Sequence, residues 1–252
     1  MRFASLGSGS KGNATLVRGG DTLVMIDCGF SLRETVRRMA RLQVEPTQLD
    51  AILVTHEHSD HSSGVAALSR HYRIPVYLTH GTAGTGRCRG SFEQRPFNCE
   101  DSFTIGDLAI KAVAVPHDAA EPCQYRLACS GFTLGILTDL GSITPHVIDN
   151  FRDCDSLLLE FNHDLPMLQD GPYPPHLKRR VGGDWGHLNN QQAADLLRQV
   201  GGAALRHLVV AHISEKNNNR ERAQSALLSV LDSLERVVFA EQASGFDWLE
   251  LA

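Results

Sequence analysis

Four possible metal ligands lie within the six residues from His56 to His61, directly after a short apolar run. Imidazole binds zinc, manganese and iron, while carboxylate favours harder ions. A regular helix or strand cannot direct all four at one ion, but a tight strand-to-helix turn can direct them toward two. His56 and His58 share a face as the strand ends, and Asp60 and His61 on the next turn can point to a second position. The alternative is a solvated loop with chance histidines.

Four other ionisable residues follow apolar, strand-like runs in the same way: Asp27, His117, Asp139 and His212. The carboxyl end of a buried strand is a costly place for a charged group without a partner. Each residue taken singly can be read as a cap or as a satisfied core residue. Together with the first group, they form one pattern, with ligands where a dinuclear metal site would need them.

The elements that must position these residues are read from hydrophobic periodicity and turn residues. A capping box at Ser31–Glu34 opens the first helix. We expect further helices at 62–71, 145–151, 190–200 and 220–234. We expect strands at 2–6, 14–18, 22–27, 51–55, 75–78, 102–105, 108–115, 124–129, 132–138, 156–159 and 208–211. This order favours an α/β protein with two sheets between helical layers.

The composition fits a folded enzyme-sized domain. The chain has 252 residues, 42% of them hydrophobic and 21% charged, so it can bury a core, and we expect one domain over residues 1–252. The formal net charge is −5, so the molecule as a whole does not attract polyanions. Any nucleic acid must therefore be held by a local cationic patch or by bound metal.

The thiols and the N-terminus favour a cytoplasmic protein. The six cysteines form no CxxC pair and no spacing typical of disulfides, which indicates reduced thiols. The first residues contain no apolar stretch long enough for a signal peptide, and no window approaches the roughly 18 apolar residues of a membrane span. We therefore expect no membrane association. No pattern in the sequence indicates an oligomeric state.

The order of these residues resembles the five ordered motifs of the metallo-β-lactamase superfamily. The motifs correspond in turn to Asp27, the HxHxDH run at 56–61, His117, Asp139 and His212, and they cover nearly the whole chain. The resemblance implies a four-layered αββα sandwich with two metal ions at the edge of the sheets. It assigns His56, His58, His117 and Asp139 to one ion. It assigns Asp60, His61, His212 and the shared Asp139 to the other. Asp27 is implied to orient the site from behind.

This ligand set implies hydrolysis. Two cations a few ångströms apart lower the pKa of a bridging water and neutralise charge on the attacked group, so that metal-activated hydroxide forms near neutral pH. The oxygen-reducing diiron branch of the superfamily has Glu at the position of His58, so redox chemistry is not expected. Zinc and manganese suit the ligands, and iron is also compatible. Asp60 is expected to be essential for catalysis.

A histidine before a helix indicates a possible proton donor. His187 precedes the predicted helix at 190–200, where free backbone N–H groups favour an anionic oxygen. In the ribonuclease Z-like phosphodiesterases, which this stretch resembles, such a histidine assists catalysis and is paired with a Glu after the preceding strand. Glu160 supplies that Glu here. We expect His187 to act as general acid, oriented by Glu160; helix capping by Asn189 or Asn190 is the simpler reading.

Two further segments are candidate phosphate contacts. Three cations at Lys178–Arg180 follow two prolines, just upstream of His187, and Lys178 and Arg180 are expected to contact a phosphate backbone unless the run is only a solvated face. The glycine-rich segment from Gly7 to Asn13 is either a phosphate-binding nest or a hairpin turn. In the first case Ser8 and Asn13 would contact substrate. The segment does not match a P-loop.

Short motifs narrow the resemblance to the YycJ/WalJ-like branch of bacterial metallo-hydrolases. They are SGSKGN near the start, ExNHD at Glu160–Asp164 with His163 inside it, YPxxLKxR, and GHLxN, where Asn189 replaces the usual Ser. That branch is linked with 5′→3′ exonuclease activity on DNA. The stretch between Asp139 and His212 is too short for the β-CASP insertion of other nucleic-acid-processing relatives.

The leading hypothesis is therefore a dinuclear metal phosphodiesterase, acting as a 5′→3′ exonuclease on DNA. The alternative is a small-molecule hydrolase acting on a cyclic phosphodiester, a thioester or a lactam. Cleavage of a small phosphodiester without salt-sensitive DNA binding would favour that alternative. A third class is a regulatory or scaffold protein that binds metal without catalysis, which the complete ligand set disfavours.

Overall fold

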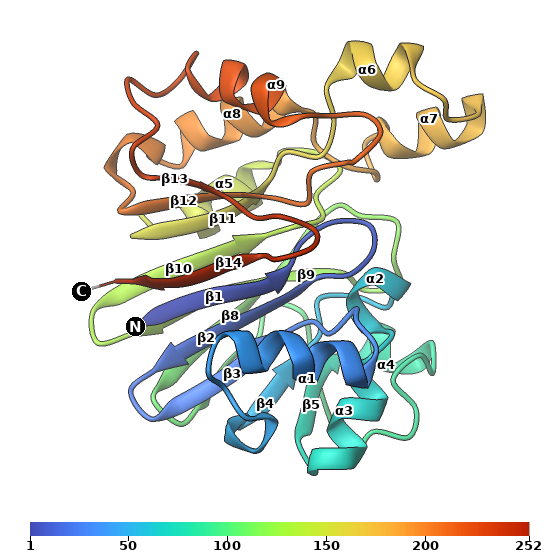
Figure 1. Cartoon of the computed structure of the whole chain (residues 1–252), viewed down its shortest axis with the longest axis vertical. Coiled ribbons are helices and arrows are strands. Elements are labelled where there is room, and N and C mark those ends of the chain that lie inside the picture. The colour runs from blue at the N-terminus through green and yellow to red at the C-terminus, as the bar shows by residue number, and fades with distance from the viewer. Residues whose placement is uncertain (252) are drawn as a thin grey trace.

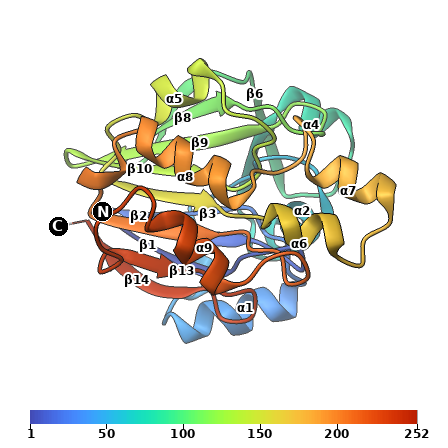
Figure 2. The ribbon, with the colours of Figure 1, turned by 90° about the horizontal axis from the view of Figure 1, so that it is seen from above.

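Two seven-stranded β-sheets pack face to face, and helices cover the outer face of each (Figures 1 and 2). The structure is a computed structural model that describes residues 1–251, with residue 203 described by its backbone alone. The layer order is helix, sheet, sheet, helix. The expected αββα sandwich is therefore confirmed.

The first sheet has the order β14-β1-β2-β3-β4-β5-β6. Strands β1 to β3 form the predicted antiparallel meander, and β3 to β6 run parallel because helical segments connect them. The strands are β1 Arg2–Gly7, β2 Ala14–Gly19, β3 Thr22–Ile26, β4 Ala51–Leu53, β5 Pro75–Thr79, β6 Glu93–Phe97 and β14 Phe246–Glu250. The helical segments are α1 Leu32–Arg41, the 3-10 turn Pro46–Gln48, α2 Ser59–Ser62, α3 Val65–Tyr72 and α4 His80–Gly84.

The second sheet has the order β13-β12-β11-β10-β9-β8-β7, with β10 to β13 parallel. Its strands are β7 Ser102–Ile105, β8 Leu108–Ala114, β9 Cys123–Cys129, β10 Phe132–Leu137, β11 Ser156–Glu160, β12 His207–Ala211 and β13 Val237–Phe239. The helical segments are α5 Pro145–Phe151, α6 Leu165–Asp170, α7 Pro175–Val181, α8 Asn190–Gln199, the 3-10 turn Gly202–Ala204 and α9 Arg220–Leu227.

Three apolar clusters hold the layers together. The central one lies between the sheets and includes Phe3, Val209 and the fully buried Tyr125, whose hydroxyl donates to the carbonyl of Val54 at 2.7 Å. A second cluster packs the first sheet against α1 and α3, and a third packs the second sheet against α5, α8 and α9. Strand β11 is buried at every residue because a parallel strand covered on both faces contacts apolar groups on both sides.

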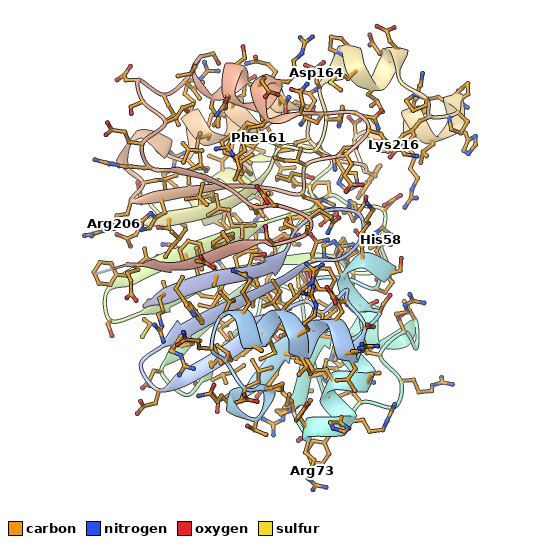
Figure 3. All side chains as sticks on the ribbon, in the orientation of Figure 1. His58, Arg73, Phe161, Asp164, Arg206 and Lys216 are labelled. Atoms are coloured by element: carbon orange, nitrogen blue, oxygen red, sulfur yellow. The ribbon has the colours of Figure 1, made fainter. Side chains whose placement is uncertain are left out.

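The strands that precede the predicted site all end at one edge of the sandwich. In the first sheet β3 and β4 are parallel; in the second, β10, β11 and β12 are parallel, and β8 shares their direction because β9 is antiparallel to both neighbours. Figure 3 shows His58 on this side of the molecule and Arg206, just before β12, on the opposite side. The topology thus gathers residues that are far apart in sequence.

The predicted elements need correction at several places, and strands β13 and β14 and helices α4 and α6 were not expected at all. The helix expected at 62–71 is α3, which begins only at Val65, and the separate short helix α2 precedes it. Between them, a Cβ at Gly64 would lie 1.9 Å from the carbonyl oxygen of Phe30, so glycine allows this close approach. The helix expected at 220–234 ends at Leu227, and the residues that follow form turns whose apolar side chains still pack on the core. Strand β6, a mostly exposed edge strand that contains Pro96, was not expected because its sequence is polar.

None of the helices in the described part of the chain is long and apolar enough to cross a membrane. The cytoplasmic location stays a prediction.

Candidate metal centre and catalytic cleft

The seven residues predicted as metal ligands lie together at the edge where the strands end. Those from the first sheet follow β4 and begin α2, and those from the second sheet follow β8, β10 and β12. Their possible ligand atoms form overlapping groups in which all atoms lie within 4.8 Å of one another. The full set is His56, His58, Asp60, His61, His117, Asp139 and His212.

One group consists of His56, His58 and His117. The Nε2 atom of His117 lies 3.3 Å from Nδ1 of His58. The ring centroids of His56 and His117 are 4.9 Å apart. Three imidazoles this close, with nitrogens facing a common point, have the donor set of a zinc or manganese site.

The second group consists of Asp60, His61 and His212, and Asp139 lies between the two groups. Asp60 Oδ2 is 3.5 Å from the Nε2 atoms of both His61 and His212. Asp139 Oδ2 is 3.1 Å from His61 Nε2, while its Oδ1 is 3.4 Å from His212 Nδ1 and 3.8 Å from His117 Nε2. Asp139 therefore lies where it can serve both groups, as the resemblance implies.

Several buried atoms of this cluster have no hydrogen-bond partner among the described residues. They are Nε2 of His56, both ring nitrogens of His212, and Oδ2 of Asp139. Buried polar atoms are costly to leave unpaired, so a cluster of them is expected to face a bound group. Imidazole and carboxylate donors around a common space fit divalent metal ions.

Burial and mutual charge shift the pKa values of the cluster in opposite directions. Burial lowers the pKa of His56 well below its usual value. Burial also opposes charge on His61, but the carboxylates of Asp139, Asp27 and Asp60 outweigh it and raise that pKa well above the usual value. Burial similarly opposes charge on Asp139, but His212 and His61 outweigh it and hold the pKa of that carboxyl well below its usual value.

Asp27 and Thr55 hold the cluster from behind. Asp27 Oδ2 lies 2.8 Å from His61 Nδ1 and accepts the hydroxyl of Thr55, whose backbone N–H donates to Asp27 Oδ1 at 2.8 Å. The Thr55 hydroxyl also lies 3.0 Å from His56 Nδ1. Asp27 (φ 60°) and His212 (φ 51°) both have left-handed backbone directly after a strand, which turns their side chains toward the cluster.

The glycine-rich segment supports the site through its own hydrogen bonds. Ser8 Oγ accepts the backbone N–H of His212 at 2.9 Å, and Asn13 Nδ2 lies 3.1 Å from His61 Nε2. The backbone N–H groups of Gly9, Lys11 and Asn13 donate to other protein atoms. These partners tie the segment to the cluster, and its predicted contact with phosphate stays a prediction.

His187 and Glu160 form the expected pair beside the cluster. Glu160 ends β11 and is fully buried, and its Oε2 lies 3.1 Å from His187 Nδ1. Its Oε1 accepts the backbone N–H groups of Leu140 at 2.6 Å and Leu188 at 3.3 Å. The carboxylate is thus fixed by both neighbouring segments. His187 Nδ1 is also 3.5 Å from Asp139 Oδ1, so the imidazole lies at the border of the metal-ligand cluster.

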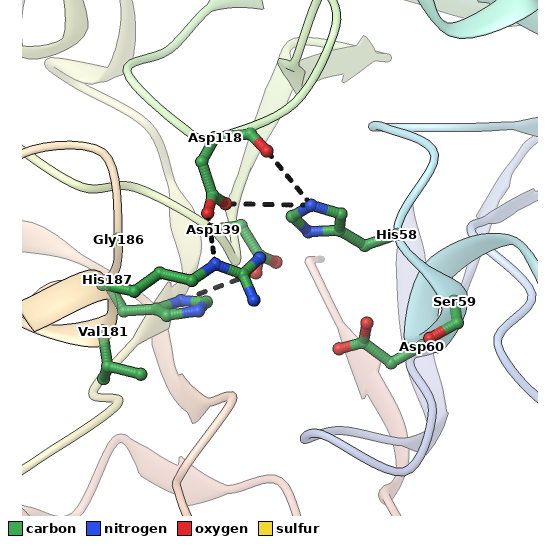
Figure 4. A pocket seen from close by; sticks show the side chains of 9 residues that line it. His58, Ser59, Asp60, Asp118, Asp139, Val181, Gly186 and His187 are labelled. Carbon is green, nitrogen blue, oxygen red and sulfur yellow. Dashed lines mark hydrogen bonds and ion pairs between the residues drawn. The ribbon is translucent and has the colours of Figure 1, made fainter. Parts of the chain in front are cut away.

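A cavity of about 280 Å³ opens onto the cluster between α2 and the chain around α7 (Figure 4). Its lining includes Asp60, Asp139, His187, Asp118 and Arg180. Arg180 forms an ion pair with Asp118, which also approaches His58 (Figure 4).

The two cations predicted to contact substrate are placed differently. Arg180 lines the cavity, while the Lys178 ammonium donates to the carbonyl of Gln169 at 2.6 Å and does not line it.

Three site residues were missed in the sequence. Asp118 directly follows His117, so its position was a usable signal. Thr55 precedes His56, but only the fold shows that it bridges Asp27 and two imidazoles. The backbone carbonyl oxygen of Gly186 lies 2.9 Å from His117 Nδ1. A Cβ at Gly186 would lie 2.2 Å from the Arg180 carbonyl oxygen, so glycine is required for this close approach to α7.

The sequence matches one family model and is similar to two named relatives over most of its length. The family model described as "Beta-lactamase superfamily domain" matches residues 22–213. An "Exodeoxyribonuclease YycJ" from Bacillus anthracis is 33% identical over 92% of this chain and 89% of its own. An "Exodeoxyribonuclease WalJ" from Streptococcus pneumoniae is 31% identical over 92% of this chain and 88% of its own.

A solved structure of low sequence identity shares the fold. The metallo-β-lactamase fold protein YhfI from Bacillus subtilis superposes with a TM-score of 0.77 at 16% identity, covering 98% of each chain.

Proposed function

Because this chain belongs to the metallo-β-lactamase superfamily, we propose that it is a metal-dependent exodeoxyribonuclease that degrades DNA from the 5′ end. The observation that carries the proposal is the His187–Glu160 pair at the border of a complete cluster of possible metal ligands. The relatives named exodeoxyribonuclease, which match nearly the full chain, support DNA as the substrate. The small-molecule alternative is not favoured.

We assign two divalent ions, zinc or manganese with iron also compatible, to the two groups described above. His56, His58, His117 and Asp139 would hold one ion, and Asp60, His61, His212 and Asp139 the other. When bound, the ions supply Lewis-acid chemistry, which activates water and neutralises charge on the phosphate. Asp27 would keep His61 oriented through the contact at Nδ1, leaving Nε2 to face the ions.

The other residues of the cleft would donate the proton to the leaving group and bind the phosphate. Glu160 holds His187 through Nδ1, which leaves Nε2 free to deliver a proton to the departing oxygen. Glu160 would also stabilise the charged imidazole in that step. Arg180, oriented by its ion pair with Asp118, would bind a phosphate oxygen of the strand. The lining of the cavity is polar, and Arg180 is the arginine or lysine that it contains, beside the carboxylates of Asp60, Asp118 and Asp139.

Degradation of end-labelled duplex DNA tests the proposal. Metal-free protein is reloaded with Mn²⁺ or Zn²⁺, and nucleotide release is followed from strands labelled at either end. We expect stepwise release from the 5′ end. The Asp60→Asn variant is expected to lose more than about 100-fold in activity, because the change removes a ligand rather than an outer support. Cleavage of bis(p-nitrophenyl) phosphate without any release from DNA contradicts the proposal.

A further inference from the structure

Three arginines line a second cavity, far from the metal-ligand cluster. This cavity of about 490 Å³ lies on the outer face of the first sheet, between the C-terminal end of α1 and β14. Its lining includes Arg2, Arg18 and Arg41 together with Gln43, Gln48 and Trp248. We name it the distal arginine pocket. The catalytic cleft contributes none of these residues.

The strand geometry shows how far apart the two cavities lie. Arg2 pairs with Arg18 across β1 and β2, so the two side chains leave the same face of the sheet. Strand β1 runs from Arg2 to Gly7, beside the Ser8 hydroxyl that holds His212. Five residues of extended chain span about 17 Å. The chain termini, which Figure 1 marks on the side away from α2, lie at this distal end.

The charges of the pocket are not balanced. Arg41 forms an ion pair with Asp247, and Arg2 lies 3.7 Å from Glu250. The Arg18 side chain forms no hydrogen bond or ion pair with any residue that the structure describes, and its Nε atom is buried without a partner. Three guanidinium groups thus face one space whose lining contains a single carboxylate, that of Asp247.

The walls of the pocket are held in place before any ligand binds. The Trp248 Nε1 donates to the carbonyl of Leu42 at 3.2 Å, which ties β14 to the end of α1. The guanidinium of Arg2 lies over the Trp248 ring, 4.6 Å from its centroid, and that of Arg41 donates to the carbonyl of Ser5 at 3.0 Å. Arg2 and Arg41, fixed in this way, lose little freedom on binding an anion.

We propose that the distal arginine pocket binds a phosphate group of a nucleotide, and that Arg18 is its central ligand. Guanidinium groups match the geometry of phosphate oxygens, and each can donate two parallel hydrogen bonds. The volume falls in the range of small-molecule sites and exceeds the need of an inorganic ion. Gln48 accepts the Glu45 N–H through Oε1, so its amide nitrogen remains to donate to the ligand. The site goes beyond the proposed nuclease reaction, and the phosphate can belong to a free nucleotide or to a strand end.

Calorimetric titration of the metal-loaded protein tests this site with 5′-dAMP, inorganic phosphate and deoxyadenosine as probes. The Arg18→Met variant keeps the aliphatic stem and removes the charge. Arg33→Met is the matched control, because Arg33 is also an arginine without a partner among the described residues, on the exposed side of α1. To test whether the phosphate belongs to a strand end, a 5′-phosphorylated oligonucleotide is titrated into the Asp60→Asn variant with and without the second change Arg18→Met.

We expect 5′-dAMP to bind wild type and Arg33→Met equally, and Arg18→Met about tenfold more weakly, with deoxyadenosine not binding. Arg18→Lys, which is the milder change if Arg18→Met does not fold, should fall between them. If Arg18→Met weakens binding of the oligonucleotide but not of 5′-dAMP, the phosphate that the pocket binds belongs to a strand end. Equal affinities of wild type and Arg18→Met, or an equal loss in Arg33→Met, overturn the proposal. Unchanged cleavage of bis(p-nitrophenyl) phosphate by Arg18→Met separates this result from failure of the metal centre.

Discussion

Four histidines of the cleft each use one ring nitrogen for support, which decides the nitrogen that each can offer. His61, His117 and His187 each place Nδ1 against Asp27, the Gly186 carbonyl or Glu160, so that Nε2 remains for other groups. His58 is reversed: its Nε2 lies 3.2 Å from the Asp118 carbonyl, and Nδ1 faces His117. The partner at the supporting nitrogen therefore selects the tautomer and the direction of each ring.

The pairing of His187 with Glu160 gives a prediction about leaving groups. Replacing His187 by Ala removes the proton donor, so cleavage of a poor leaving group such as a nucleotide oxygen should slow by about 10²- to 10⁴-fold. Cleavage of bis(p-nitrophenyl) phosphate should slow far less, because p-nitrophenolate leaves without a proton. Steady-state rates on both substrates measure the difference. An equal loss on the two substrates would reject the general-acid role.

A buried histidine outside the ligand set makes stability depend on pH. His163 is 1% exposed and has no hydrogen-bond partner at either ring nitrogen among the described residues; burial lowers its pKa to about 4. The unfolded chain takes up a proton near pH 6.5 and the folded chain only near pH 4, so stability is lost as the pH falls through this window. Over the whole window this loss amounts to about 3 kcal/mol.

The His163→Gln variant, compared with the parent by urea unfolding at pH 7 and pH 4.5, tests this. Both proteins are kept metal-free so that protonation of the shared ligands cancels in the difference. We expect the free energy of unfolding to fall less with acidification in His163→Gln than in the parent. An identical fall in both would show that His163 does not contribute.

At the scale of elements, α7 presents its cations to two different surroundings. Arg180 reaches the catalytic cavity and pairs with Asp118, while Lys178 closes on the carbonyl of Gln169 at the end of α6. Helix α7 therefore supplies one cation that can contact substrate, Arg180, and another that links the helix to α6, Lys178. Gly186 packs closely against the carbonyl oxygens of this helix and connects it to His187.

This division predicts unequal effects of the two cations on DNA binding. Arg180→Met should weaken binding and lower the slope of log affinity against log salt by about one, as expected for one lost phosphate contact. Lys178→Met, the matched control on the same helix, should leave the slope unchanged. Binding to a labelled oligonucleotide, measured over a range of salt concentrations with the Asp60→Asn background, gives both slopes. Equal slopes for all three proteins would assign Arg180 to the solvated surface.

At the scale of the whole molecule, the cluster joins the two halves of the sandwich. His56, His58, Asp60 and His61 come from the first sheet and α2, and His117, Asp139 and His212 come from the second sheet. A cation bound by both sets would therefore bind the native sandwich more tightly than the unfolded chain, in which the ligands of the first sheet are separated from those of the second. Metal binding should act as a cross-link between the sheets.

We accordingly expect added Zn²⁺ or Mn²⁺ to raise the melting temperature of metal-free protein. At an ion concentration 100 times the dissociation constant, the stabilisation is about 2.7 kcal/mol for one site. Asp60→Asn should reduce the rise, because one group loses a ligand. Calorimetric melting with and without a chelator measures both values. A melting temperature indifferent to metal in the parent protein would argue against ligands drawn from both sheets.

The amino-acid sequence, together with the resemblance of its ordered motifs to the metallo-β-lactamase superfamily, was sufficient for the fold class and for the set of possible ligands that the structure gathers into one cluster. The HxHxDH run brings four possible ligands together through local geometry alone. His117, Asp139 and His212 each follow an apolar strand, and these three strands, β8, β10 and β12, run in the same direction. Strand ends of common direction meet at one sheet edge, so alternation and chain order were enough to predict the juxtaposition. Glu160, by contrast, was predicted from the resemblance to ribonuclease Z-like phosphodiesterases, and the structure places it at the end of β11.

Contacts between distant segments needed the folded chain. Asp118 meets Arg180, Thr55 bridges Asp27 and His61, and these pairings depend on loop paths that no local pattern encodes. The same holds for the distal arginine pocket, where Arg2 and Arg18 face Arg41 only because β1, β2 and α1 pack as they do. Periodicity and ligand chemistry are local properties and can be read along the chain, whereas the balance of charge in a cavity is a property of the packed molecule.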